Sequence, residues 1–308
     1  MKHILFSKNL IVVRGLYCYL FLLLFLSLSC TKKSPTLTIG LVADPQYANK
    51  PSKGKRHYRE SLWKLKEAID SFNDHQVDFI QNLGDIIDDD WESFDSILPV
   101  YDHLDSKIEN YHLLGNHEFS VDSSYLKGLV EKLSMPDFYY SYSKKGWRFI
   151  VLDVTDYSYY SNSLHNYDVN EIHNYFNYTQ GKQNNYRWNS AIGLEQQQWI
   201  KDELCYANLL DQKVVFFSHM PIRPKDNPHN LWNDFEIIDL IENHPKVVAF
   251  INGHNHSGDY TFKNGIHYIT VFGMVDTTIS SYGILELFDN QLILKGFGNQ
   301  KSFHLYYR

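Results

Sequence analysis

The feature that most constrains this chain is a series of short apolar runs, each of which ends in polar side chains. Residues 37–43 form the first run, which Asp44 follows, and residues 77–83 form the second, which Asp85 follows after a glycine. Near-continuous apolar runs of this length are typical of strands that are covered on both faces. Sheets of such strands present polar chemistry where the strands end. The sequence therefore predicts an α/β fold with a functional site along one edge.

A third run ends in the pentapeptide LGNHE, residues 114–118, where three polar side chains follow a glycine. Asn116 offers a neutral oxygen ligand, His117 a titratable imidazole, and Glu118 a carboxylate that can orient either one. An Asn-His pair after a glycine is often only a loop, so its meaning depends on partners elsewhere in the chain.

Helical patterns separate these runs. Apolar residues at spacings of three and four predict an amphipathic helix over 57–74, and a second helix is expected over 91–106, distorted near Pro99. The later strands are expected at 138–142, 147–151, 213–217, 247–251, 266–272, 282–288 and 292–295, and the later helices at about 193–207 and 233–243.

Residues 157–190 are rich in tyrosine and asparagine and poor in aliphatic side chains. This segment is either a solvated surface excursion or a cap that helps to select a substrate. Within it, Tyr186 and Trp188 either pack on their surroundings or stack on a base. Residues 37–308 are expected to form a single domain that includes this insertion, because the length is ample for one core.

The N-terminus has the pattern of a targeting segment. Basic residues precede an uncharged apolar run at 16–28, which has the length of a signal-peptide core and is too short to span a bilayer comfortably. The run ends LSLSC, which resembles a bacterial lipoprotein cleavage site at Cys30. We therefore expect residues 1–29 to be a lipoprotein signal peptide, Cys30 to carry lipid, and 30–36 to be a tether. The protein is then an exported, membrane-anchored lipoprotein on the periplasmic or cell-surface side; an uncleaved anchor and ordinary secretion are the alternatives.

Charge and cysteine content limit the functions that are open to the chain. The formal net charge is −7, and removal of residues 1–29, which carry three positive and no negative charges, makes it −10. No long basic run exists, which disfavours a nucleic-acid partner. An acidic protein that handles phosphate groups needs metal ions to neutralise them. Cys18 is expected to leave with the signal peptide and Cys30 to carry lipid, so Cys205 remains alone and is expected to be buried in a helix. A disulfide and a cysteine-based metal site are then excluded.

Five expected strand ends carry polar groups. They are Asp44/Gln46, Asp85/Asp88, Asn116/His117, His219 and His254/His256. Each has an ordinary explanation alone, since a Gly-Asp pair is a common turn and a strand-end histidine is often structural. The GHNH segment at 253–256 is more informative, because residues i and i+2 of an extended segment can converge on adjacent metals. Taken together and in this order, the five groups predict a metal site.

In these motifs the chain resembles the calcineurin-like metallophosphoesterase superfamily, whose pattern is D-x-[H/Q], G-D-x-x-D, G-N-H-[D/E], H and G-H-x-H. The resemblance covers about 37–290 and implies a four-layer αββα sandwich with a two-metal site on the strand-end loops. The implied ligands of one metal are Asp44, Gln46, Asp85 and His256. Those of the second are Asp85, which bridges the two, Asn116, His219 and His254.

The resemblance also implies a mechanism. Two divalent metals about 3.5 Å apart share a bridging hydroxide and clamp the phosphoryl oxygens during in-line attack. His117 stays off the metals and donates a proton or hydrogen bond to the phosphoryl or leaving oxygen. Asp88 pairs with His117 and holds it cationic, and Glu118 supports the ligands.

Gln46 narrows the resemblance, because most of the superfamily has histidine at this position. A side-chain amide ligates only through its neutral oxygen, a harder donor than imidazole nitrogen, which favours Mn²⁺, with Fe or Zn as alternatives. The D-x-Q form followed by Tyr47 is similar to the manganese-dependent ADP-ribose/CDP-alcohol diphosphatase family, and the stretches 193–200, 253–260 and 265–267 agree. The implied reaction is hydrolysis of the pyrophosphate bond in nucleoside diphosphate-linked molecules.

Two other functions remain open. The first is a phosphomonoesterase or phosphodiesterase on the same scaffold; a purple acid phosphatase is disfavoured, because the second motif there supplies a tyrosine ligand where this chain has Asp88. The second is a catalytically inactive surface binding lipoprotein. Its weakness is that a competent donor fills every ligand position and that His117 and Asp88 are both present.

Overall fold

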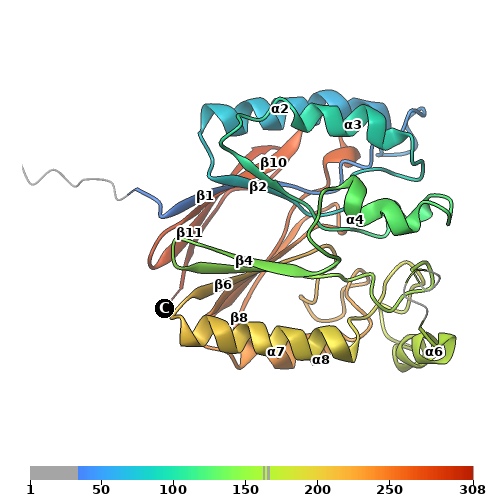
Figure 1. The fold of residues 1–308 in the computed structure, drawn as a ribbon, viewed down its shortest axis with the longest axis vertical. Coiled ribbons are helices and arrows are strands. Elements are labelled where there is room, and N and C mark those ends of the chain that lie inside the picture. The colour runs from blue at the N-terminus through green and yellow to red at the C-terminus, as the bar shows by residue number, and fades with distance from the viewer. Residues whose placement is uncertain (1–33, 162–163, 165–166, 308) are drawn as a thin grey trace, which may run out of the picture. The chain divides into compact units, whose positions relative to one another are not determined.

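Two six-stranded β-sheets lie face to face between two layers of helices (Figure 1). The structure is a computed structural model that describes residues 34–161, 164 and 167–307. The expected signal peptide at 1–29, Cys30 and the start of the tether lie outside the described residues. The predicted α/β fold and four-layer αββα sandwich are confirmed.

The first sheet contains the three N-terminal strands, the third of them at its edge. Its order is β12-β11-β10-β1-β2-β3, in which β1, β2 and β3 run parallel and β10 pairs antiparallel with β1. The strands are β1 (Leu37–Val42), β2 (Phe79–Asn82), β3 (Glu109–Tyr111), β10 (Ser281–Leu287), β11 (Gln291–Gly298) and β12 (Phe303–Tyr306). Helices α2 (Ser61–Asp74), which a short helical turn at Tyr58–Glu60 precedes, and α3 (Ser93–Tyr101) cover its outer face (Figure 1).

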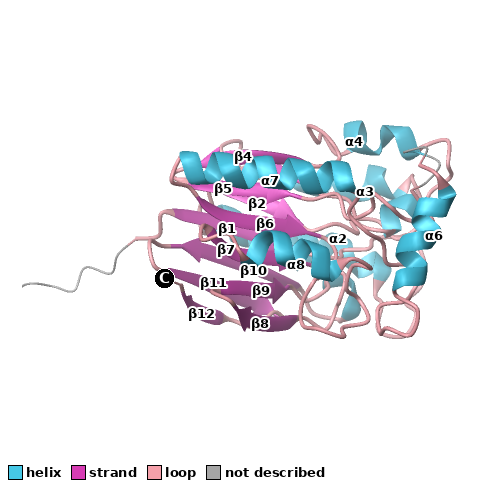
Figure 2. Cartoon of the chain, turned by 90° about the horizontal axis from the view of Figure 1, so that it is seen from below, coloured by secondary structure: helices cyan, strands magenta, loops and turns pink. Residues whose placement is uncertain are grey.

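The second sheet has the order β4-β5-β6-β7-β9-β8, and β5, β6, β7 and β9 run parallel. The strands are β4 (Tyr140–Lys144), β5 (Trp147–Val151), β6 (Lys213–Ser218), β7 (Val247–Asn252), β8 (Asp259–Lys263) and β9 (Ile266–Thr270). Helices α7 (Leu194–Leu209) and α8 (Asp234–Glu242) lie across this sheet (Figure 2).

Aromatic side chains fill the space between the sheets. The ring of Phe79 in β2 meets that of Phe149 in β5 edge to face, with 5.1 Å between centroids, and Phe149 stacks on Phe217 in β6. All three are fully buried. Because apolar side chains from both sheets share one core, the two sheets are held rigidly and their strand ends keep a fixed spacing.

Short elements and loops gather at one end of the sandwich (Figures 1 and 2). They include helix α4 (Leu129–Lys132), helix α6 (Val169–Tyr178) of the tyrosine-rich insertion, and 3₁₀ turns at His117–Ser120, Leu126–Gly128 and Met274–Asp276. Ile172 of α6 packs with Ala191 and Trp232 in a small apolar cluster of its own. The insertion is therefore anchored to the body of the protein by buried side chains.

Three details differ from the sequence-based expectations. The third strand ends at Tyr111 rather than at Leu114, and β8 and β12 were not predicted. Cys205 is exposed on α7, which corrects the expectation that it is buried. The buried stripe of this helix includes Ile200 and Leu204, and the next residue along a helix points about 100° away from its neighbour. Within the part of the chain that the structure describes, no helix combines the length and apolarity needed to cross a bilayer.

Candidate metal centre

The predicted ligands lie in loops that leave the carboxyl ends of parallel strands. Asp44 and Gln46 follow β1, Asp85 follows β2, and His254 follows β7. All four have left-handed backbone conformations, with φ between 41° and 66°. Such conformations are strained in residues other than glycine and persist only where the surroundings enforce them. Backbone hydrogen bonds connect two of these loops, since the N–H of Gln46 donates to the carbonyl of Asp85 at 2.8 Å.

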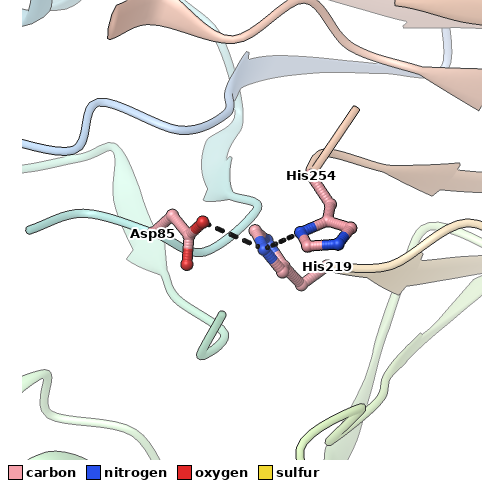
Figure 3. A group of neighbouring side chains, drawn as sticks. All are labelled: Asp85, His219 and His254. Atoms are coloured by element: carbon pink, nitrogen blue, oxygen red, sulfur yellow. Dashed lines mark hydrogen bonds and ion pairs between the residues drawn. The ribbon is translucent and has the colours of Figure 1, made fainter. Parts of the chain in front are cut away.

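Asp85, His219 and His254 form the buried middle of the centre (Figure 3). Nε2 of His219 lies 3.2 Å from Oδ2 of Asp85 and 3.1 Å from Nδ1 of His254. One ligand atom from each of the three residues falls within 4.8 Å of the others. Three donors from three separate loops are therefore close enough to bind one ion.

Asn116 adds an amide oxygen to this group, with Oδ1 3.3 Å from Nε2 of His219. The other ring nitrogen of His219, Nδ1, lies 2.8 Å from the carbonyl of Leu83, which can only accept a hydrogen bond. Nδ1 therefore carries a proton, and Nε2 faces the ligand atoms. Burial opposes a second proton on this ring, but the Asp85 carboxylate outweighs it and raises the pKa of His219 to about 9. A divalent cation bound here would take the place of that second proton.

Asp44, Gln46 and His256 adjoin this group on its other side. Nε2 of Gln46 lies 3.1 Å from both Oδ2 of Asp85 and Nε2 of His256, and Nε2 of His256 lies 3.6 Å from Oδ1 of Asp44. Oε1 of Gln46 is buried and has no hydrogen-bond partner among the described residues. A half-turn of this amide would place the oxygen among the other ligand atoms. An orphaned buried oxygen is costly to leave unpaired, and a divalent cation would satisfy it.

The structure thus brings all seven predicted ligands into one connected cluster. They are Asp44, Gln46, Asp85, Asn116, His219, His254 and His256. The donors are carboxylate and amide oxygens and imidazole nitrogens, without a thiolate. This set fits the divalent cations that the sequence indicated, with Mn²⁺ among the best suited.

His117 lies beside the cluster and is paired with Asp88. Its Nδ1 is 3.1 Å from Oδ1 of Asp88, and its backbone N–H donates to Oδ1 of Asp85 at 2.8 Å. Burial opposes a charge on His117, but the Asp85 and Asp88 carboxylates outweigh it and raise the pKa of His117 to about 9. The two carboxylates therefore favour the cationic form of the ring. It lines a cavity of about 620 Å³ together with Lys50 and Arg56, both of which also pair with Asp88.

Glu118 holds two ligand-bearing loops together. Its fully buried carboxylate accepts N–H groups from Asp85 at 3.0 Å, Ile86 at 2.5 Å and Ile87 at 3.3 Å, all in the loop after β2. It also accepts the N–H of Gly115, at 2.7 Å, in the loop that carries Asn116. The carboxylate contacts backbone donors of both loops, which agrees with the supporting role expected from the sequence.

Several residues at or near the ligands belong to no sequence motif, so no pattern in the chain indicated that they would lie at the site. Asp276 lies 2.8 Å from Nδ1 of His256, and the buried amine of Lys64 donates to the carbonyl of Met274 at the start of the same turn. The ring of His229 meets that of His254 edge to face at 5.3 Å. Asn189, in the insertion, lies 3.2 Å from Nε2 of His254.

Tyr186 and Trp188 stack on each other, with 3.9 Å between ring centroids and 14° between ring planes. Both rings are partly exposed, at 40% and 43%. Of the two roles considered for these rings, packing on their surroundings or stacking on a base, the contact corresponds to packing. The side chains that line the two cavities next to the histidines do not include either ring.

Comparisons with known proteins agree with this geometry. The model of the calcineurin-like phosphoesterase family matches residues 37–258. The chain is 30% identical to the manganese-dependent ADP-ribose/CDP-alcohol diphosphatase of Xenopus laevis, over 90% of this chain and 92% of that protein. It is 28% identical to the rice protein of the same name, over 86% and 92%. A dimetal phosphatase from Danio rerio superposes with a TM-score of 0.79 at 25% identity, over 89% of this chain and all of that one.

Replacement of Glu118 by glutamine should destabilise the protein and weaken Mn²⁺ binding. The amide nitrogen would face backbone donors that now bind the carboxylate, which leaves buried N–H groups unpaired at a cost of about 2–4 kcal/mol. Urea unfolding and calorimetric titration with MnCl₂ measure the two effects. Glu131→Gln, at an exposed site, is the matched control and should change neither. Equal unfolding midpoints for the two variants would contradict the role given to Glu118.

Proposed function

Because the chain belongs to the calcineurin-like phosphoesterase family, we propose that it hydrolyses the pyrophosphate bond of nucleoside diphosphate-linked molecules of the ADP-ribose or CDP-alcohol type. The substrate class rests on the similarity to manganese-dependent ADP-ribose/CDP-alcohol diphosphatases, which extends over most of this chain and most of each relative. Gln46 supports it, because the D-x-Q form of the first motif is the feature by which the sequence resembles those proteins.

The cluster described above would hold two divalent metal ions, with Mn²⁺ as the favoured ion. When bound, they supply positive charge and Lewis acidity at the phosphoryl oxygens. Asp85 lies between the two halves of the cluster, within 3.2 Å of both Gln46 and His219, and would help to hold both ions. The buried loops around it hold the ligands in position before substrate arrives.

His117 is placed to act on the substrate rather than on the metals. Asp88 binds its Nδ1, which keeps the ring protonated and leaves Nε2 as the donor for a phosphoryl or leaving oxygen. Lys50 pairs with Oδ2 of Asp88, and Nη1 of Arg56 lies 3.7 Å from Oδ1, the oxygen that also faces His117, so both cations help to fix the orientation of the carboxylate. Proton or hydrogen-bond donation by His117 would neutralise charge on the oxygen that leaves.

A basic segment beside the centre supports a substrate with more than one phosphate. Lys53, Lys55 and Arg56 line a cavity of about 580 Å³ together with His254 and His256. The chain as a whole is acidic, so this is a local concentration of positive charge. A diphosphate with one phosphoryl group at the metals would extend its second charged group toward these side chains.

The substrate class can be tested with the purified protein loaded with MnCl₂. ADP-ribose and CDP-choline should both be hydrolysed with a higher kcat/KM than p-nitrophenyl phosphate, and EDTA should abolish all activity. Asn116→Ala and His254→Ala should each lower turnover by orders of magnitude. Preference for the nitrophenyl monoester would instead favour a phosphomonoesterase, and turnover that survives chelation would contradict the metal-dependent mechanism. Absence of hydrolysis from well-loaded protein would favour a binding protein.

Replacement of His117 by glutamine should lower kcat about 10²- to 10⁴-fold, because the variant cannot donate a proton from a cationic ring. Its metal content, measured by inductively coupled plasma mass spectrometry, should equal that of the unsubstituted protein. His103→Gln, at an exposed position away from the centre, is the matched control. Loss of metal from the His117 variant would identify this side chain as a ligand and overturn its assignment.

We also propose that the protein is exported and anchored to a membrane through lipid on Cys30. The apolar run at 16–28 and the small residue before Cys30 support this location. Mass spectrometry of the protein made in a bacterial host should find a lipidated Cys30 at the mature N-terminus, and Cys30→Ala should prevent it. A mature chain that begins at any other residue would contradict the lipoprotein assignment.

A further inference from the structure

Asn189 is a buried residue of the insertion whose side chain reaches the metal centre. It is fully inaccessible to solvent, and its Oδ1 lies 3.2 Å from Nε2 of His254. The two residues are 65 positions apart in the sequence. No sequence motif indicates that Asn189 and His254 are in contact, and only the folded structure brings them together.

The hydrogen bonds of Asn189 determine which way its amide faces. Nδ2 donates to the carbonyl of Pro228 at 2.7 Å and to the carbonyl of Asn184 at 3.1 Å. Both partners can only accept, so the two hydrogens of Nδ2 are used by them. The oxygen of the amide must then be the atom that faces His254. An amide oxygen only accepts, and the hydrogen in this contact must come from Nε2 of the histidine.

The other nitrogen of His254 points into the cluster. Nδ1 lies 3.1 Å from Nε2 of His219, which in turn faces the Asp85 carboxylate. A neutral imidazole carries one proton, and a proton held on Nε2 leaves the electron pair on Nδ1. We propose that Asn189 is a positioning residue that holds His254 in this tautomer and ring orientation, with Nδ1 directed at the metal centre. This inference rests on the proposed function only in that His254 is taken as a metal ligand.

The surroundings of Asn189 are built to hold it in place. The backbone N–H of Trp232 donates to the carbonyl of Ser190 at 2.7 Å, and its indole N–H donates to the carbonyl of Tyr186 at 3.0 Å. Asn184 donates to the carbonyl of Leu231 at 2.6 Å. These bonds join the end of the insertion to the segment between β6 and α8. Asn189 therefore brings the insertion to the centre with a side chain that is held on both sides.

The role of the insertion follows from this arrangement. The sequence left it as either a surface excursion or a substrate cap. Beside either role, its C-terminal end supports a ligand of the centre, since second partners of metal-binding histidines set the ring orientation and the basicity of the ligating nitrogen. Loss of such a partner typically weakens metal affinity about 10- to 100-fold.

Asn189→Ala tests the proposal with two measurements that do not depend on catalysis. Long-range ¹H–¹⁵N spectra of the imidazole-labelled protein report the tautomer of His254, whose resonances are identified by their loss in His254→Gln. The unsubstituted protein should show a proton on Nε2 that is protected from exchange with solvent, and Asn189→Ala should lose this protection. Calorimetric titration with MnCl₂ should show affinity about 10- to 100-fold weaker in the variant.

Two further variants separate positioning from a general effect on the insertion. Asn185→Ala removes a donor that binds Phe176 and Thr179 within the insertion and contacts neither Asn189 nor His254, so it should keep the protected Nε2 proton and the Mn²⁺ affinity. Asn189→Asp keeps an acceptor for Nε2 but loses both donors, and should keep the tautomer while lowering the unfolding temperature. Equal weakening of Mn²⁺ binding by Asn185→Ala and Asn189→Ala would overturn the proposal.

Either of two other results would also overturn it: a protected Nε2 proton that survives in Asn189→Ala, or one that is lost in a folded Asn189→Asp. These readouts are independent of the substrate. Failure to hydrolyse ADP-ribose or CDP-choline, with the tautomer and affinity contrasts intact, would refute the proposed substrate class and leave the role of Asn189 standing.

Discussion

The buried carboxylate of Glu118 is the interaction on which the metal centre most depends. It accepts backbone N–H groups from the loop after β2 and from the loop after β3, and so holds Asp85 and Gly115 in place. A carboxylate removed from water is costly unless donors surround it. Burial and the neighbouring Asp85 raise the pKa of Glu118 to about 7, against the pull of those donors. Cations bound at Asp85 would favour the charged form of Glu118, so the ligands and their support stabilise each other.

The same loops approach so closely that two glycines have no room for a side chain. A Cβ on Gly115 would lie 2.2 Å from Oδ1 of Asp85, and one on Gly84 would lie 2.8 Å from Nδ1 of His219. Gly84 also has a φ of 88°, which favours glycine on its own account. The glycines in the predicted motifs therefore have a steric cause. They let ligands from different strand ends come within hydrogen-bond distance of each other.

The fold class and the ligand set could be predicted because both depend on short patterns of neighbouring residues in the sequence. Apolar runs indicate the buried strands, and the polar residue after each run lies at the shared edge of parallel strands, as Asp85 and His254 do. Contacts across long stretches of chain leave no such pattern. Asn189 reaches His254 only because the insertion folds back on the segment after β6. The prediction that Cys205 is buried rested on how often free cysteines are buried in proteins. Its exposure is instead set by its position on α7, on a face that points away from the buried side.

The pairing of β1 with β10 bears on the order in which the protein can assemble. β1 lies between β2 and β10 in its sheet, and β10 begins at Ser281, beyond every predicted ligand. A polypeptide emerges N-terminus first, so Asp44 leaves the ribosome 210 residues before His254, whose backbone N–H it accepts. A nascent chain that has not yet reached His219 holds only four of the seven predicted ligands. Metal acquisition is thus a property of the finished polypeptide, and the compartment in which folding ends decides which ion it meets.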